Sequence, residues 1–139
     1  MTTHSVNTVY NDHMAFTATI NGHEVRMDTT ADDGGKDSGP SPKRLMLAAL
    51  GGCTGMDIVP MLIKMKVPFS NFSINIDATV REEYPKIYNR VKITYTIKMA
   101  VTDKPKMEKA IALSQEKYCS VSAMFKSFAK LETEIIILD

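Results

Sequence analysis

Two cysteines, Cys53 and Cys119, are the residues with the clearest capacity for chemistry in this sequence. Cys53 follows two adjacent glycines in the stretch LMLAALGGCTGM, and Cys119 lies where the helical pattern breaks and restarts in YCSVSAMFKSF. Amide groups near the start of a helix favour a thiolate, which is the reactive form of cysteine. Two thiols that both lie at helix irregularities suggest a redox pair. The competing interpretation is that Cys53 is inert, because free cysteines are often simply buried.

Other kinds of site find little support in the sequence. A structural zinc site is not expected, because neither cysteine has a second cysteine or histidine at ligand spacing, and we expect no other cofactor. His4, His13 and His23 are scattered over predicted N-terminal strands, where we interpret them as surface residues. With 17 basic and 16 acidic residues, the charge balance gives no electrostatic reason to expect nucleic acid or a membrane surface as a partner.

Length and cysteine content indicate the kind of protein. The chain of 139 residues predicts a single domain over residues 1–139 with a real hydrophobic core. Its first ten residues, MTTHSVNTVY, lack the basic region and apolar run of a signal peptide. Two cysteines in a chain of this size do not resemble a secreted disulfide scaffold. We therefore expect a cytoplasmic protein whose thiols are free, catalytic or redox-active.

A predicted helix that runs to about Met65 must position Cys53. Ser41 as the cap and Pro42 at the first helical position form its start signal, and Val67-Pro68 ends it. Apolar residues cover more than one stripe of this helix, whereas a single sheet buries only one stripe. The sequence therefore predicts a homo-oligomer in which the helix is buried at the interface.

The composition of this helix also bears on its surroundings. A membrane span is the less favoured interpretation, because Asp57 would be costly at a bilayer centre and Pro60 lies inside the segment. Gly51 and Gly52 weaken a helix, but they would let another backbone or a ligand come close beside Cys53.

Strands and shorter helices flank this helix. Alternating apolar residues predict a hairpin with an Asn21-Gly22 turn before the helix and an antiparallel pair after it. A second helix begins near Asp103, and Ser120 or Ser122 could cap a third. The segment LETEIIILD reads as a final strand, so the order of elements predicts an α+β fold. The predicted strands cover residues 6–10, 14–20, 24–28, 72–81 and 91–99.

Two motifs resemble those of one protein family. The run GPSPKRLMLAALGGCTGMDIV at residues 39–59 and the run LSQEKYCSVSAM at residues 113–124 are similar to the OsmC/Ohr family, the osmotically inducible and organic hydroperoxide resistance proteins, and closest to its OsmC-like branch. The resemblance implies an intertwined homodimer in which antiparallel sheets wrap around a central buried helix. It also implies two active sites at the dimer interface.

The resemblance further implies thiol-dependent reduction of small organic hydroperoxides. On that interpretation the Cys53 thiolate attacks the peroxide bond and becomes a sulfenic acid. Cys119 then resolves it to a disulfide, and an external dithiol reductant restores the pair. No nucleic acid and no membrane take part.

The sequence departs from the family's peroxidases at the pocket. Those proteins carry a glutamate ten residues before the first cysteine, where this chain has Lys43, and the glutamate pairs with an arginine from a loop that corresponds to residues 11–14. That loop holds no arginine here, and Arg26 falls in a later strand. Two alternatives to a peroxidase follow: an OsmC-like protein that binds an apolar or thiol-containing ligand beside Cys53, and a purely structural dimer with inert thiols.

Overall fold

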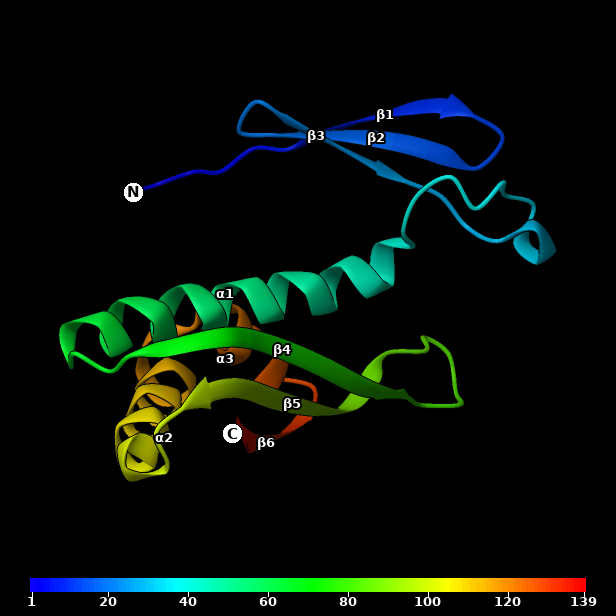
Figure 1. Ribbon diagram of the computed structural model, residues 1–139. Coiled ribbons are helices and arrows are strands. Elements are labelled where there is room, and N and C mark those ends of the chain that lie inside the picture. Colours follow the sequence, from blue (N-terminus) through cyan, green and yellow to red (C-terminus); the bar gives the residue numbers. More distant parts are fainter. The chain divides into compact units, whose positions relative to one another are not determined.

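The computed structural model describes all residues 1–139, which divide into two compact units, residues 1–46 and 47–139 (Figure 1). The predicted α+β order is confirmed, with strands before and after a long central helix. The expectation of one domain stays a prediction. The elements in chain order are β1 (Asn7–Asp12), β2 (Ala15–Ile20), β3 (His23–Met27), α1 (Pro42–Lys64), β4 (Phe69–Val80), β5 (Tyr88–Met99), α2 (Lys104–Leu113), α3 (Ser120–Lys126) and β6 (Lys130–Leu138).

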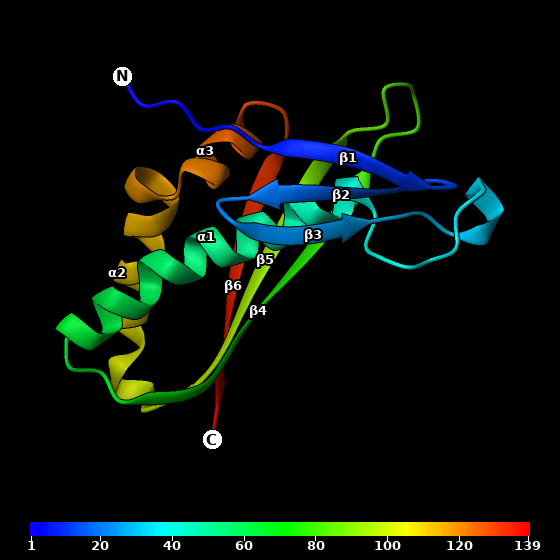
Figure 2. The same cartoon turned by 90° about the horizontal axis from the view of Figure 1, so that it is seen from above.

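The first unit contains a three-stranded antiparallel sheet in the order β1-β2-β3 (Figure 2). Asn21 and Gly22 connect β2 to β3 with φ values of 37° and 89°. Positive φ at both central residues is the requirement of a type I′ hairpin turn, which explains why the sequence has Asn-Gly there. The predicted hairpin and the additional strand before it are confirmed.

The polar loop after β3 is organised around the carboxylate of Asp28. Oδ1 accepts a hydrogen bond from Thr29 N at 2.7 Å, and Oδ2 accepts from Lys36 N at 3.3 Å, Ser38 N at 3.1 Å and Ser38 Oγ at 2.5 Å. These hydrogen bonds, first that of the Ser38 hydroxyl, hold the pKa of Asp28 far below its usual range. A Cβ at Gly35 would lie 2.2 Å from the Thr29 carbonyl oxygen, so the loop needs glycine there.

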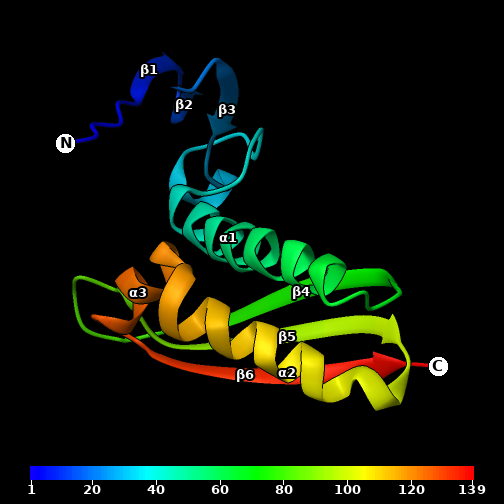
Figure 3. The ribbon, with the colours of Figure 1, turned by 90° about the vertical axis from the view of Figure 1, so that its left-hand side faces the viewer.

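The second unit contains a three-stranded sheet in the order β4-β5-β6. β4 and β5 pair antiparallel, as the alternation predicts, but β5 and β6 run parallel (Figure 3), so this sheet is mixed rather than antiparallel. The physical reason is the long connection over residues 100–129, which contains α2 and α3. It is long enough to return the chain to the starting end of β5, as parallel pairing requires.

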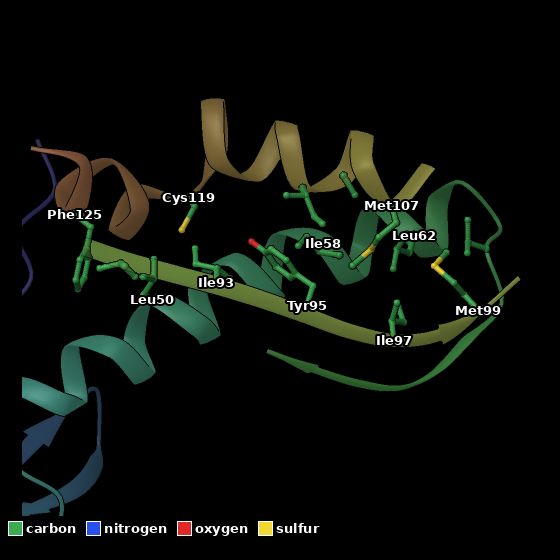
Figure 4. Close-up of a cluster of buried hydrophobic side chains, with 14 of the residues drawn as sticks. Leu50, Ile58, Leu62, Ile93, Tyr95, Ile97, Met99, Met107, Cys119 and Phe125 are labelled. Atoms are coloured by element: carbon green, nitrogen blue, oxygen red, sulfur yellow. The ribbon is translucent and has the colours of Figure 1, made fainter. Parts of the chain in front are cut away.

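One stripe of α1 enters the core of this unit. The stripe consists of Leu50, Thr54, Ile58 and Leu62, each four residues after the last, and all four are fully buried. Figure 4 shows side chains from α1, α2, α3 and the inward face of β5 meeting there. The inward residues of β5 are Val91, Ile93, Tyr95, Ile97 and Met99.

The other faces of α1 stay uncovered in a single chain. Met56 is 79% exposed and Ile63 is 65% exposed, although both are large apolar side chains. By length and composition alone, α1 is also apolar enough to cross a membrane, a property that it shares with core helices of globular proteins. In a single chain α1 is therefore fully buried along one stripe only, and its burial on the remaining faces in a homodimer stays a prediction.

Candidate functional site

The two cysteines lie close together in the second unit. Cys53 is in the middle of α1 and is partly buried, whereas Cys119 precedes α3 and is 3% exposed. Both thiols are free, and they lie near enough for Cys53 to raise the pKa of the Cys119 thiol. The predicted proximity of these residues is therefore confirmed, despite their separation in the sequence.

An irregular helical turn places Cys119. α2 continues into the π-helical turn Ser114–Tyr118, in which Cys119 N donates to Ser114 O at 2.7 Å. The backbone of Cys119 is then extended, with φ −75° and ψ 101°, and this ends the helix. π-helical turns inside helices often occur at functional sites.

Cys119 itself caps α3, which corrects the expectation of a serine cap. Its Sγ accepts a hydrogen bond from Ser122 N at 3.3 Å, whereas Ser120 is already the first helical residue. Serine is a much commoner helix cap than cysteine, and the sequence pattern therefore favoured the wrong residue. The cap also fixes the rotation of the Cys119 side chain, which enters the core in Figure 4.

Burial raises the pKa of the Cys119 thiol. Hydrogen bonding from Ser122 opposes this effect, and the neighbouring Cys53 thiol adds to it. The Ser122 amide donates to Cys119 Sγ at 3.3 Å, whereas the buried Ser122 hydroxyl has no hydrogen-bond partner. Cys119 therefore keeps its proton at neutral pH.

A buried polar cluster beside the cysteines was missed in the sequence. Thr54 Oγ1 lies 2.7 Å from Tyr95 OH and 2.8 Å from Ser114 Oγ, and Ser114 Oγ donates to Asp57 Oδ2 at 2.9 Å. Gln115 Nε2 donates to Tyr95 OH at 3.2 Å and to Thr54 Oγ1 at 3.3 Å. The available signal was positional, since Thr54, Tyr95 and Ser114 each occupy an inward position of an otherwise apolar pattern.

The residues that correspond to the Arg/Glu pair of the family's peroxidases, Arg26 and Lys43, both lie in the first unit. Lys43 is exposed in the first turn of α1, where the family's peroxidases have glutamate. Arg26 projects from β3 toward the end of β1, with Nη2 3.5 Å from Asp12 Oδ1 and Nε donating to Ser38 Oγ at 2.9 Å. An arginine therefore does reach the loop at residues 11–14, but from a neighbouring strand, which the sequence pattern did not reveal.

The three histidines lie at the surface of the first unit. His4, His13 and His23 are exposed, in agreement with their interpretation as surface residues. No group of three or more His, Cys, Asp or Glu side chains is arranged to hold a metal ion.

Comparison with known proteins agrees with these features. The Escherichia coli protein YhfA is 30% identical over 105 residues, which cover 76% of this chain and 75% of YhfA. The crystal structure of an Aquifex aeolicus protein has a TM-score of 0.85 at 27% identity, and covers 99% of this chain and 98% of its own. An organic hydroperoxide resistance protein from Legionella pneumophila shares the fold, with a TM-score of 0.71 at 14% identity and 98% of both chains covered. Residues 35–134 match the family of OsmC-like proteins, and the chain therefore belongs to that family.

Proposed function

We propose that this protein is a thiol-dependent peroxidase that reduces small organic hydroperoxides, with Cys53 as the nucleophile and Cys119 as the resolving thiol. The proximity of the two thiols carries the proposal, because an inert buried cysteine has no need of a second thiol beside it. The Legionella pneumophila relative is named for organic hydroperoxide resistance, which supports the substrate class. The cytoplasm, where thiols stay reduced between turnovers, is the compartment that suits this chemistry.

The proposed reaction balances with one hydroperoxide and one external dithiol. The Cys53 thiolate attacks the O–O bond, forms a sulfenic acid and releases an alkoxide, which takes a proton from solvent to become an alcohol. The Cys119 sulfur then attacks the Cys53 sulfur, and the hydroxide leaves as water with the Cys119 proton. The external dithiol returns two electrons and two protons by thiol–disulfide exchange.

The surroundings of the two thiols favour this division of roles. Cys53 is the more accessible sulfur, which a substrate could reach from the open side of α1. Cys119 is buried, keeps its proton and lies near Cys53. A resolving thiol of this kind stays out of contact with peroxide until the sulfenic acid has formed beside it.

A homodimer forms part of the proposal. Two shallow hollows of about 310 and 560 Å³ lie along the seam between α1 and β4, and both include Gly52 and Ile74. The larger hollow is mostly apolar and includes the exposed Met56 and the half-buried Phe72. A second copy of the chain would cover this surface, as the all-round apolar pattern of α1 requires. Sedimentation at micromolar concentration should then show one dimeric species, and a stable folded monomer would contradict the dimer.

Peroxide treatment followed by non-reducing mass spectrometry tests the thiol chemistry. One equivalent of cumene hydroperoxide should yield an intrachain disulfide that joins the Cys53 and Cys119 peptides with the loss of two hydrogens. Cys119→Ser should accumulate sulfenic and sulfinic Cys53, and Cys53→Ser should not react. If the wild type gives only sulfinic Cys53 or interchain disulfides, Cys119 is not the resolving thiol.

The same hollows favour a second candidate function, the binding of an apolar or thiol-containing ligand beside Cys53 without peroxide turnover. Lys43 at the position of the catalytic glutamate agrees with this alternative. Steady-state turnover of cumene and tert-butyl hydroperoxide with a dithiol reductant separates the two functions. A thiol pair that forms a disulfide once but shows no turnover would favour ligand binding.

A further inference from the structure

The buried polar cluster beside the thiols contains a chain of hydroxyl groups with one direction. The Ser114 hydroxyl gives its only proton to the Asp57 carboxylate, so it must accept from Thr54. Thr54 has then used its own proton and must accept from Tyr95. We call the sequence Tyr95–Thr54–Ser114–Asp57 the hydroxyl chain.

The hydroxyl chain joins the two backbone segments that carry the cysteines. Thr54 directly follows Cys53 on α1. Ser114 binds Thr54 through its side chain at 2.8 Å, and its carbonyl oxygen accepts the hydrogen bond from Cys119 N at 2.7 Å. A short hydrogen-bonded route therefore runs from one cysteine to the other without passing through the sulfur atoms.

The anchors of the hydroxyl chain are fully buried. Tyr95 lies on the central strand β5, and Thr54 lies on the inner stripe of α1. The residues Thr54, Tyr95 and Ser114 are all 0% exposed. Burial raises the pKa of Tyr95, so its hydroxyl stays protonated as the first donor. Gln115 Nε2 donates to both Tyr95 and Thr54 and completes their hydrogen bonding.

We propose that Thr54 and Ser114 are positioning residues. They hold Cys53 and Cys119 at the separation and orientation that a disulfide requires, and so set how readily the pair forms its disulfide. The inference rests on the thiol pair of the proposed function and deepens it. A disulfide forms only over a narrow range of Cα separations and side-chain directions. Loosening α1 from the π-helical turn lowers the effective concentration of one thiol at the other.

Equilibration with glutathione measures this effect. The full-length protein is incubated over a range of ratios of reduced to oxidised glutathione, and the fraction of intrachain disulfide is quantified by alkylation and mass spectrometry. Thr54→Val and Ser114→Ala should each lower the effective concentration about tenfold, which raises the reduction potential by about 30 mV. Thr54→Ser keeps the hydroxyl and should restore a value within about twofold of wild type.

A matched control separates positioning from general stability. Thr96→Val makes the same change on β5, on the face opposite Tyr95, and should leave the glutathione equilibrium unchanged. Thermal unfolding of each reduced variant checks that it is folded. If Ser114→Ala does not fold, the glutathione experiment uses Thr54→Val alone. A purely structural role would lower the melting temperature without moving the reduction potential.

The results decide the inference without reference to peroxide turnover. Folded Thr54→Val and Ser114→Ala variants with potentials equal to wild type would overturn it, and so would a Thr54→Ser variant as impaired as Thr54→Val. If the wild type forms no Cys53–Cys119 disulfide at any glutathione ratio, the inference and the thiol pairing fall together. Failure of hydroperoxide turnover alone counts against the proposed peroxidase and not against the role of the hydroxyl chain.

Discussion

Gly52→Ala tests whether another molecule covers the open side of α1 next to Cys53. Within one chain the substitution meets no obstacle, because a Cβ at Gly52 has no atom within 4 Å. Replacing glycine by alanine inside a helix adds about 1 kcal/mol of stability. For a chain of this length that gain would raise the melting temperature by about 3–5 °C.

The proposed homodimer predicts no gain in stability, or a loss. If a partner chain packs against Gly52, an added methyl group overpacks the interface at a cost of about 1–3 kcal/mol. The net change per chain then lies between zero and a loss of about 2 kcal/mol, combining the two effects. Each dimer contains the substitution twice, so its dissociation constant should rise by one or more orders of magnitude.

Gly51→Ala is the matched control for this experiment. A Cβ at Gly51 meets Ile76 of the same chain at 3.7 Å, an ordinary van der Waals contact, so this variant should gain the full helix-propensity stabilisation. Thermal unfolding at two protein concentrations and sedimentation equilibrium compare both variants with wild type. A Gly52→Ala protein that melts higher and associates as wild type would refute the idea that the glycine accommodates a partner.

Three further outcomes are expected. Because the pKa of Asp28 is depressed, its ionised carboxylate stabilises the folded loop above the ordinary carboxyl pKa of about 3.9. This stabilisation is lost as the pH falls below that value. Limited proteolysis of residues 28–40 should therefore increase in acid for wild type and not for Asp28→Asn. Burial raises the pKa of Cys119, so in Cys53→Ser the alkylation of Cys119 should have a pH midpoint above the free-thiol value of about 8.5; a midpoint below it would contradict a protonated resolving thiol. If Lys43 lies at the pocket rim, Lys43→Glu should lower the rate ratio of a fatty-acid hydroperoxide to a neutral alkyl hydroperoxide by about two- to fivefold, and an unchanged ratio would remove this position from the site.

The parts of the fold that local rules determine could be predicted from the sequence. The Asn21-Gly22 turn, the start of α1 at Pro42 and the antiparallel pairing of β4 with β5 each depend on neighbouring residues or on a simple alternation. The parallel pairing of β6 depends on how far the helices between β5 and β6 return the chain. No residue of β6 itself encodes that direction.

The candidate site was predictable to a similar extent. The two cysteines stand out in a sequence because their chemistry is rare, and the family motifs relate one to the other. The hydroxyl chain does not stand out, because Thr54, Tyr95 and Ser114 are common residues on three separate elements. Only their convergence on shared hydrogen bonds gives them a role, and that convergence is a property of tertiary structure.

The two unusual features of α1 have one physical explanation in the proposed assembly. A helix that buries one stripe in its own chain should be polar elsewhere, yet α1 keeps Met56 and Ile63 on its uncovered faces. The same uncovered side includes Gly52. Glycine lowers the stability of the helix there, and a Cβ at this position would have no atom within 4 Å. Apolar side chains without cover and a glycine without a neighbour are both unfavourable for an isolated chain. Both become favourable when another molecule approaches α1 closely beside Cys53, and a site built there would depend on assembly as well as on folding.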